Sequence, residues 1–140
     1  MKHVANLVAA AFFFLTTSIA AAQTPPVQKA KFIPPVKGIA TIEVMQLPSK
    51  RVGNDMVTVY KVRNTSKGSI NLLKVDEYWY DKSAKMVSGT SYAHTKAPIR
   101  PGEVVEIALA SPYKAEMRQN QAIFAHANGK IEAKSVKAMK

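Results

Sequence analysis

The 140-residue sequence predicts an all-β fold, and two patterns support this. From Ile39 onward, short runs rich in Val, Ile, Thr and Tyr alternate with clusters of Gly, Pro, Asn and Ser, at spacings typical of an antiparallel β protein. Within several of these runs, apolar and polar residues alternate, which gives each strand one face in the core and one nearer solvent. We therefore expect a β domain with at most one short helix.

The first 22 residues have the three parts of a secretory signal peptide. Lys2 supplies a positive start, an apolar run ends at Ala20, and the small residues Ala20 and Ala22 stand three and one positions before the expected cut. We expect cleavage between Ala22 and Gln23. Removal of 22 of the 140 residues leaves 118, enough for one domain with a hydrophobic core. An uncleaved signal anchor is the alternative, because the apolar run approaches the roughly 20 residues that span a bilayer.

Cysteine is absent from the sequence, which excludes a lipid anchor at the cleavage site and leaves stability to packing. No segment after the signal peptide is apolar enough to cross a membrane. We therefore expect a mature chain without a membrane span, located in the periplasm or secreted through its cleaved signal peptide.

Residues 23–37 form a Pro- and Lys-rich segment with four prolines and three lysines. Proline opposes both a helix and a central strand because it lacks the amide hydrogen that each of them uses. We expect an extended arm, which Phe32 and Ile33 hold against the β domain at 38–140.

Seven strands are expected in the domain, at residues 39–46, 55–63, 69–80, 86–93, 103–109, 121–127 and 130–136. In the first strand, alternate residues from Ala40 to Val44 are apolar, and the same holds from Val105 to Leu109 in the fifth, where Glu106 points away. This alternation predicts one buried face for each strand.

The connections between these strands carry turn residues. Asn64 and Asp81 begin two polar clusters, and their side chains can accept hydrogen bonds from backbone amides of the turns. Arg100-Pro101-Gly102 turns the chain into the fifth strand. Asn128-Gly129 predicts a hairpin with a type I′ turn, because both central residues of that turn need positive φ.

A short helix is expected at 112–119, where Ser111 can cap and Pro112 can occupy the first turn. Seven short strands cannot bury both faces of one flat sheet, whereas two packed sheets share one core. The expected fold is therefore an immunoglobulin-like antiparallel β-sandwich of about seven strands. A small barrel is the alternative.

Four segments together resemble a known domain family: Val62–Ser66, Leu73–Val75, Tyr78–Lys82 and Ile99–Glu103. They show a strand ending in an Asn-Thr-Ser turn, a strand ending in an aromatic residue and Asp, and a Pro-Gly-Glu turn before another strand. Over residues 62–109 the chain thus resembles the FxLYD-type exported bacterial β-sandwich domains, although the family has Phe, Leu and Gly at Glu77, Trp79 and Ala84. The resemblance implies an extracytoplasmic interaction or accessory domain without known catalytic residues.

No catalytic or metal-binding pattern stands out. Asp76, Glu77 and Asp81 are close in sequence, but neighbouring strand residues point to opposite faces, so we interpret them as a polar strand face and a turn cap. His94 and His126 belong to no cluster with metal-ligand spacing. We expect no enzyme activity, no cofactor and no metal; a hydrolase that uses Asp76, Glu77 or His94 is retained as a third alternative.

The residues around Trp79 are the best binding candidates. If Trp79 faces the core, Tyr78 and Tyr80 face outward together. Aromatic rings beside positive charges can stack on and attract a polymeric ligand. The predicted binding surface consists of Tyr78, Tyr80, Lys74, Lys82 and Lys85.

The chain is strongly basic, with 20 Lys and Arg against nine Asp and Glu, a formal charge of +11. Loss of Lys2 with the signal peptide leaves 19 basic residues and a charge of +10. This excess favours anionic partners through long-range attraction, or it serves solubility. The C-terminal lysines (Lys130, Lys134, Lys137 and Lys140) could extend a basic edge or discourage aggregation at a strand edge.

The leading hypothesis is a noncatalytic exported binding or accessory domain that contacts an anionic envelope component or a protein partner. We do not expect nucleic acid as the partner. The alternative is a structural subunit that assembles by strand pairing in an envelope or secretion complex, with the arm at 23–37 supplying a strand.

Overall fold

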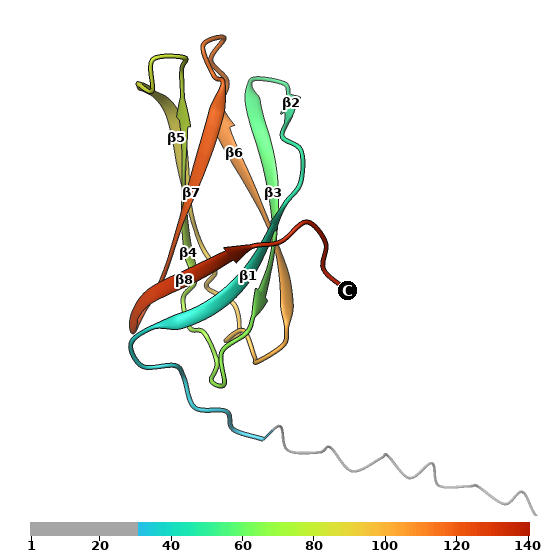
Figure 1. Ribbon diagram of the computed structural model, residues 1–140, viewed down its shortest axis with the longest axis vertical. Helices are drawn as coiled ribbons and strands as arrows, with labels where there is room; N and C mark the ends of the chain where they lie inside the picture. Colours follow the sequence, from blue (N-terminus) through green and yellow to red (C-terminus); the bar gives the residue numbers. More distant parts are fainter. Residues whose placement is uncertain (1–30) are drawn as a thin grey trace, which may run out of the picture. The chain divides into compact units, whose positions relative to one another are not determined.

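The computed structural model describes residues 31–140, and this part of the chain contains eight strands and no helix (Figure 1). The predicted signal peptide, with Ala20, Ala22 and Gln23, lies outside the described residues. The chain from 31 to 140 accordingly holds no helix that could cross a membrane. The strands are β1 (Ala40–Gln46), β2 (Lys50–Val52), β3 (Asp55–Asn64), β4 (Lys74–Tyr80), β5 (Met86–Ala93), β6 (Val104–Pro112), β7 (Gln119–His126) and β8 (Gly129–Ser135).

The eight strands form one mixed and strongly curled sheet with the shape of a half-barrel. The order is β2-β3-β1-β8-β7-β4-β5, and β6 pairs with β3 along its other edge. The all-β expectation is confirmed, but the expectation of wholly antiparallel pairing is wrong, because β1 and β8 run parallel from Ala40 beside Ile131 to Val44 beside Ser135.

β8 connects two parts of the sheet. It pairs with β7 only next to their hairpin, Ala125 with Lys130 and His126 with Gly129, and from Ile131 onward it pairs with β1. Figure 1 shows β7 and β8 leaving the hairpin in different directions. The two strands therefore separate, and the sheet stays open between them.

The core lies on the concave side of this sheet. The alternate residues predicted to face inward in β1 are all buried, and in β6 Ile107 and Leu109 are buried and Val105 partly so. Burial of one such aliphatic side chain contributes about 1.5–3 kcal/mol. Glu106 points outward as predicted, and its carboxylate lies 3.0 Å from the Lys61 ammonium. Further core residues are Tyr60, Val62, Ile70, Leu73, Val75 and Ile99.

Two predicted elements, one strand and one helix, differ from what the structure shows. The strand expected at 69–80 begins only at Lys74, because Leu72 adopts a φ of 49°, outside the extended region; Ile70 makes an isolated bridge to Ile99. The helix expected at 112–119 is wrong. Pro112 ends β6, and the Ser111 hydroxyl, instead of capping a helix, donates to the Glu77 carboxyl at 2.8 Å.

The predicted β7–β8 hairpin is confirmed, but its type I′ turn is wrong. The loop residues are Ala127 and Asn128, and neither has a positive φ. Gly129 is the first residue of β8, and a Cβ atom there would overlap the carbonyl oxygen of Gly38. Glycine is therefore needed at this position for a close approach of two backbones rather than for the turn itself.

The described part of the arm lies against the segment before β4. Pro35 pairs with Ser69, and the Val36 amide donates to the Ser69 carbonyl at 2.8 Å. Val36 also packs against the core. Phe32 does not hold the arm as expected, because its side chain is 81% exposed. Backbone pairing replaces it in that role.

Candidate binding surface

β4 separates inward from outward residues by strict alternation. Val75, Glu77 and Trp79 are buried, whereas Tyr78 and Tyr80 are partly exposed on the opposite face. The prediction that Trp79 faces the core is confirmed. Side chains two residues apart in a strand share a face, so Lys74, Tyr78 and Tyr80 form one row on the outside of the sheet. We call this row, together with the neighbouring outward side chains of β5 and β7, the β4 outer face.

β5 and β7 complete the β4 outer face. Tyr78 lies between Gly89 on β5 and Gln121 on β7, and a Cβ atom on Gly89 would lie 2.7 Å from the Glu77 carbonyl oxygen and 3.4 Å from the Tyr78 ring. Glycine therefore lets β5 approach β4 beside the tyrosine. Two apolar side chains that sequence analysis did not single out belong to this face, Met86 (57% exposed) beside Tyr80 and Ile123 (49% exposed) beside Asp76.

The turn between β4 and β5 places two lysines at the end of this row. Asp81 Oδ1 accepts hydrogen bonds from the Ser83 amide (2.8 Å), the Ser83 hydroxyl (2.7 Å) and the Lys85 amide (3.0 Å), which confirms the predicted cap. These hydrogen bonds lower the pKa of the Asp81 carboxyl, and the bond from the Ser83 hydroxyl has the largest effect, followed by the bond from the Lys85 amide. Ala84, where the FxLYD family has Gly, adopts a φ of 62°. Lys82 and Lys85 are exposed in this turn.

The five residues predicted from sequence therefore lie on one strand and its adjoining turn. Asp76 is the one carboxylate in the outward row of β4, and it accepts a hydrogen bond from the Ser91 hydroxyl on β5 at 2.6 Å. The arrangement combines two aromatic rings, three lysines and two exposed apolar side chains. Such a surface offers aromatic rings for stacking and ammonium groups for ion pairing.

Glu77 is the largest departure from the sequence interpretation, which placed it on a polar strand face. Its side chain is 0% exposed and lies in the core. Three neutral donors reach its carboxyl: the Tyr60 hydroxyl (2.9 Å), the Ser111 hydroxyl (2.8 Å) and the Asn120 amide (2.9 Å). A buried carboxyl is tolerated when its oxygens are hydrogen-bonded in this way.

The Tyr60 hydroxyl, which donates to this carboxyl, has a pKa far above its ordinary value of 10.0. Burial is the largest cause, followed by the charge of Glu77 and the hydrogen bond to it. Above pH 10 the unfolded chain therefore loses the Tyr60 proton while the folded chain keeps it. Stability should fall as pH rises, by at most about 1.4 kcal/mol per pH unit from this group.

Tyrosinate absorbance during an alkaline titration measures this effect. Tyr60, which is buried, should ionise only on unfolding. The part of the absorbance change that accompanies unfolding should therefore be lost in Tyr60→Phe. An absorbance change from Tyr60 that precedes unfolding would contradict its buried position.

The remaining candidates for catalysis or metal binding do not converge. His126 is buried, and its Nε2 donates to the Gly38 carbonyl (2.8 Å) while its Nδ1 accepts from the Asn128 amide (3.3 Å). His94 lies beside the Tyr92 hydroxyl, 3.5 Å away. Among residues 31–140, no three His, Asp or Glu side chains are grouped as a metal site would need.

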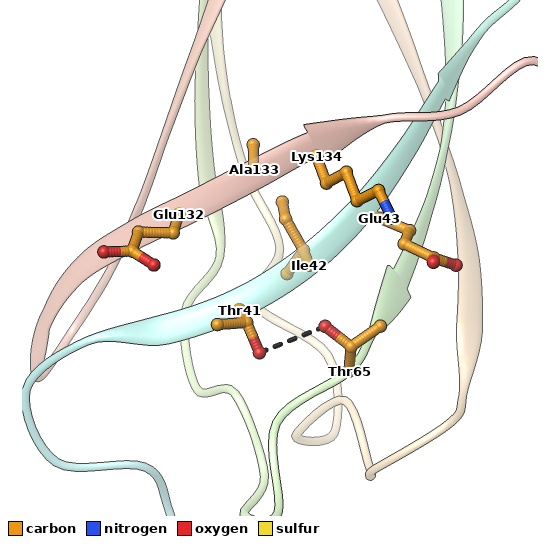
Figure 2. A pocket seen from close by; sticks show the side chains of 7 residues that line it. All are labelled: Thr41, Ile42, Glu43, Thr65, Glu132, Ala133 and Lys134. Atoms are coloured by element: carbon orange, nitrogen blue, oxygen red, sulfur yellow. Dashed lines mark hydrogen bonds between the residues drawn. The ribbon is translucent and has the colours of Figure 1, made fainter.

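A shallow hollow of about 410 Å³ lies on the outer side of β1 and β8 (Figure 2). Glu43 and Glu132 both border it, but Figure 2 shows their carboxylates pointing in opposite directions. Glu43 lies 3.4 Å from Arg63, and the Thr65 hydroxyl donates to the Thr41 hydroxyl at 3.0 Å. The carboxylates of this hollow therefore do not act together on one ligand.

No protein-family model matches the chain, and no curated protein matches it in sequence. Among solved structures, the chain is similar to IrmA from Escherichia coli, with a TM-score of 0.51 and 8% sequence identity. The match covers 72% of this chain and 95% of that chain. At this identity the likeness concerns the fold alone, that of a small β protein, and the resemblance to FxLYD-type domains stays a prediction.

Proposed function

We propose that the protein is a noncatalytic exported domain that binds an anionic envelope polymer or lipid surface through the β4 outer face. The observation that carries this proposal is the single row of Lys74, Tyr78 and Tyr80, with Lys82 and Lys85 in the turn at its end. Lysines attract the anion over a distance, and tyrosine rings provide rigid contact area with hydroxyls that can hydrogen-bond.

We propose also that the half-barrel is an immunoglobulin-like sandwich related to FxLYD-type domains. In this description β1, β2, β3, β6 and β8 form one layer, and β4, β5 and β7 form the other. The pairing of β3 with β1 and β6, and of β4 with β5 and β7, supports the division into layers. The turn contacts of Asn64 and Asp81 support the relationship, because both residues belong to the shared pattern.

Salt dependence tests the proposed binding. The mature chain would be incubated with isolated peptidoglycan sacculi and, separately, with vesicles containing phosphatidylglycerol, in 0.05 M and 0.5 M salt. Raising the salt shortens the screening length to about 4 Å, so affinity for at least one of these probes should fall by on the order of tenfold. Unchanged binding in 0.5 M salt would exclude an electrostatic interaction.

A matched pair of triple variants locates the binding face. Replacement of Lys74, Lys82 and Lys85 by Gln should weaken binding by on the order of tenfold, because all three charges adjoin the tyrosines. Replacement of Lys37, Lys50 and Lys67 by Gln removes the same charge from exposed positions off this face and should change affinity less than about twofold. Equal losses in both triple variants would overturn the assignment of the face.

A further inference from the structure

A second surface lies where β7 and β8 separate. A groove of about 520 Å³ opens there toward the core. Its apolar lining comes from β1, β7 and β8 through Val44, Ala122, Phe124 and Ala133. The Tyr60 ring forms part of the wall and meets the Phe124 ring edge to face, with centroids 6.1 Å apart.

The edge of β7 beside this groove carries unpaired backbone groups. β4 pairs with one edge of β7 from Gln119 to Ala125, whereas β8 reaches the other edge only at Ala125 and His126. Across the described chain, no strand covers that edge from Gln119 to Phe124. An unpaired strand edge presents amide and carbonyl groups to any extended chain that aligns with it.

The groove accepts the side chains that such an extended chain would present. Successive side chains of a strand alternate between two faces, so a strand added to β7 would direct every second side chain into the groove. The other half would extend the β4 outer face beyond Gln121 and Ile123. Apolar side chains fit the walls formed by Val44, Phe124 and Ala133.

The one charged residue that lines the groove is basic, Lys137. No acidic side chain of the described residues belongs to the lining. Charge complementarity therefore favours an acidic occupant.

We propose that the free edge of β7 binds an extended acidic peptide segment of a partner protein by strand addition. Main-chain hydrogen bonds to residues 119–124 supply affinity, alternate apolar side chains fill the groove, and an acidic residue faces Lys137. This site adjoins the β4 outer face at Gln121 and Ile123 but uses none of the lysines or tyrosines of that face.

A random peptide library displayed on phage and selected against the mature chain tests the proposal. Selected peptides should alternate apolar residues with other residues and carry net negative charge. A synthetic copy of the strongest binder should slow hydrogen exchange of the amides in 119–124. Slowed exchange along the edges of β2, β5 or β6 instead, or a library that yields no binder, would overturn the proposal.

Two variants test this site, and the first has a matched charge control. Lys137→Glu should weaken the acidic peptide by about tenfold, whereas Lys67→Glu, an equal charge change at an exposed turn, should leave it within about twofold. Ala133→Phe should fill the groove and weaken binding by about tenfold or more, with an unchanged melting temperature because Ala133 is exposed.

Two outcomes identify a different occupant or a different site. A peptide copying residues 23–33 of this chain, which is basic, should not compete with the selected peptide; competition would replace the acidic partner by the arm of a second copy. The Lys74, Lys82 and Lys85 triple variant should keep its affinity for the peptide, so failure of the proposed envelope binding leaves this result unaffected. Loss of peptide binding in that triple variant would contradict a separate site.

Discussion

Replacement of Glu77 by alanine should destabilise the domain by about 4 kcal/mol. The substitution leaves a cavity in the core and removes the acceptor for the hydroxyls of Tyr60 and Ser111 and the amide of Asn120. A buried donor that loses its partner costs about 1–3 kcal/mol, and the cavity adds to this loss. Urea denaturation followed by tryptophan fluorescence measures the change through Trp79, the single tryptophan of the chain.

Two controls distinguish the buried network from a general effect of losing an acid. Glu77→Gln keeps the volume, and the Ser111 hydroxyl can turn to accept from the new amide, so the cost should stay within about 1.5 kcal/mol. Glu106→Ala removes an exposed carboxylate paired with Lys61 and should cost under about 1 kcal/mol. A loss below about 1 kcal/mol in Glu77→Ala would show that the carboxyl is not buried among these donors.

Replacement of Asn64 by alanine should destabilise the domain by about 3 kcal/mol. The Asn64 side chain is fully buried, and its amide donates to the carbonyls of Gly68 and Ile99, both at 2.9 Å. Its Oδ1 accepts from the Ser66 amide at 2.8 Å. The substitution leaves all three backbone groups without this partner, and it releases the turn after β3 from the segment before β6.

The matched control for Asn64 is Asn54→Ala, at an exposed turn between β2 and β3 where the side chain makes no hydrogen bond to a described residue. This change should stay within about 0.5 kcal/mol. Comparable losses at Asn64 and Asn54, measured by the same urea denaturation, would contradict the role of the Asn64 amide as a tie between two segments.

Local patterns in the sequence predicted the strands better than their connections. Period-two alternation located β1 and β6, and turn residues located the ends of β3 and β4, because these signals act within a few residues. The helix expected at 112–119 failed because a long-range contact, Ser111 with Glu77, decides the conformation there. The parallel pairing of β8 with β1 is likewise set by packing between distant segments.

The candidate surface followed from alternation once Trp79 was assigned to the core. The same reasoning would have placed Glu77 in the core, since it lies two residues before Trp79 on the same strand face. Its donors come from β3, β6 and β7, which no local pattern brings together. The groove between β7 and β8 depends on where two strands separate, so it was visible only in the structure.

Chemical-shift mapping tests most directly whether the β4 outer face is the binding surface. The ¹⁵N-labelled mature chain would be titrated with nanodiscs containing phosphatidylglycerol and with soluble peptidoglycan fragments. Shifts or line broadening should concentrate at Lys74, Tyr78, Tyr80, Lys82 and Lys85, with smaller changes at Met86 and Ile123. Changes confined to the hollow of β1 and β8, around Thr41 and Lys134, would contradict binding through the β4 outer face.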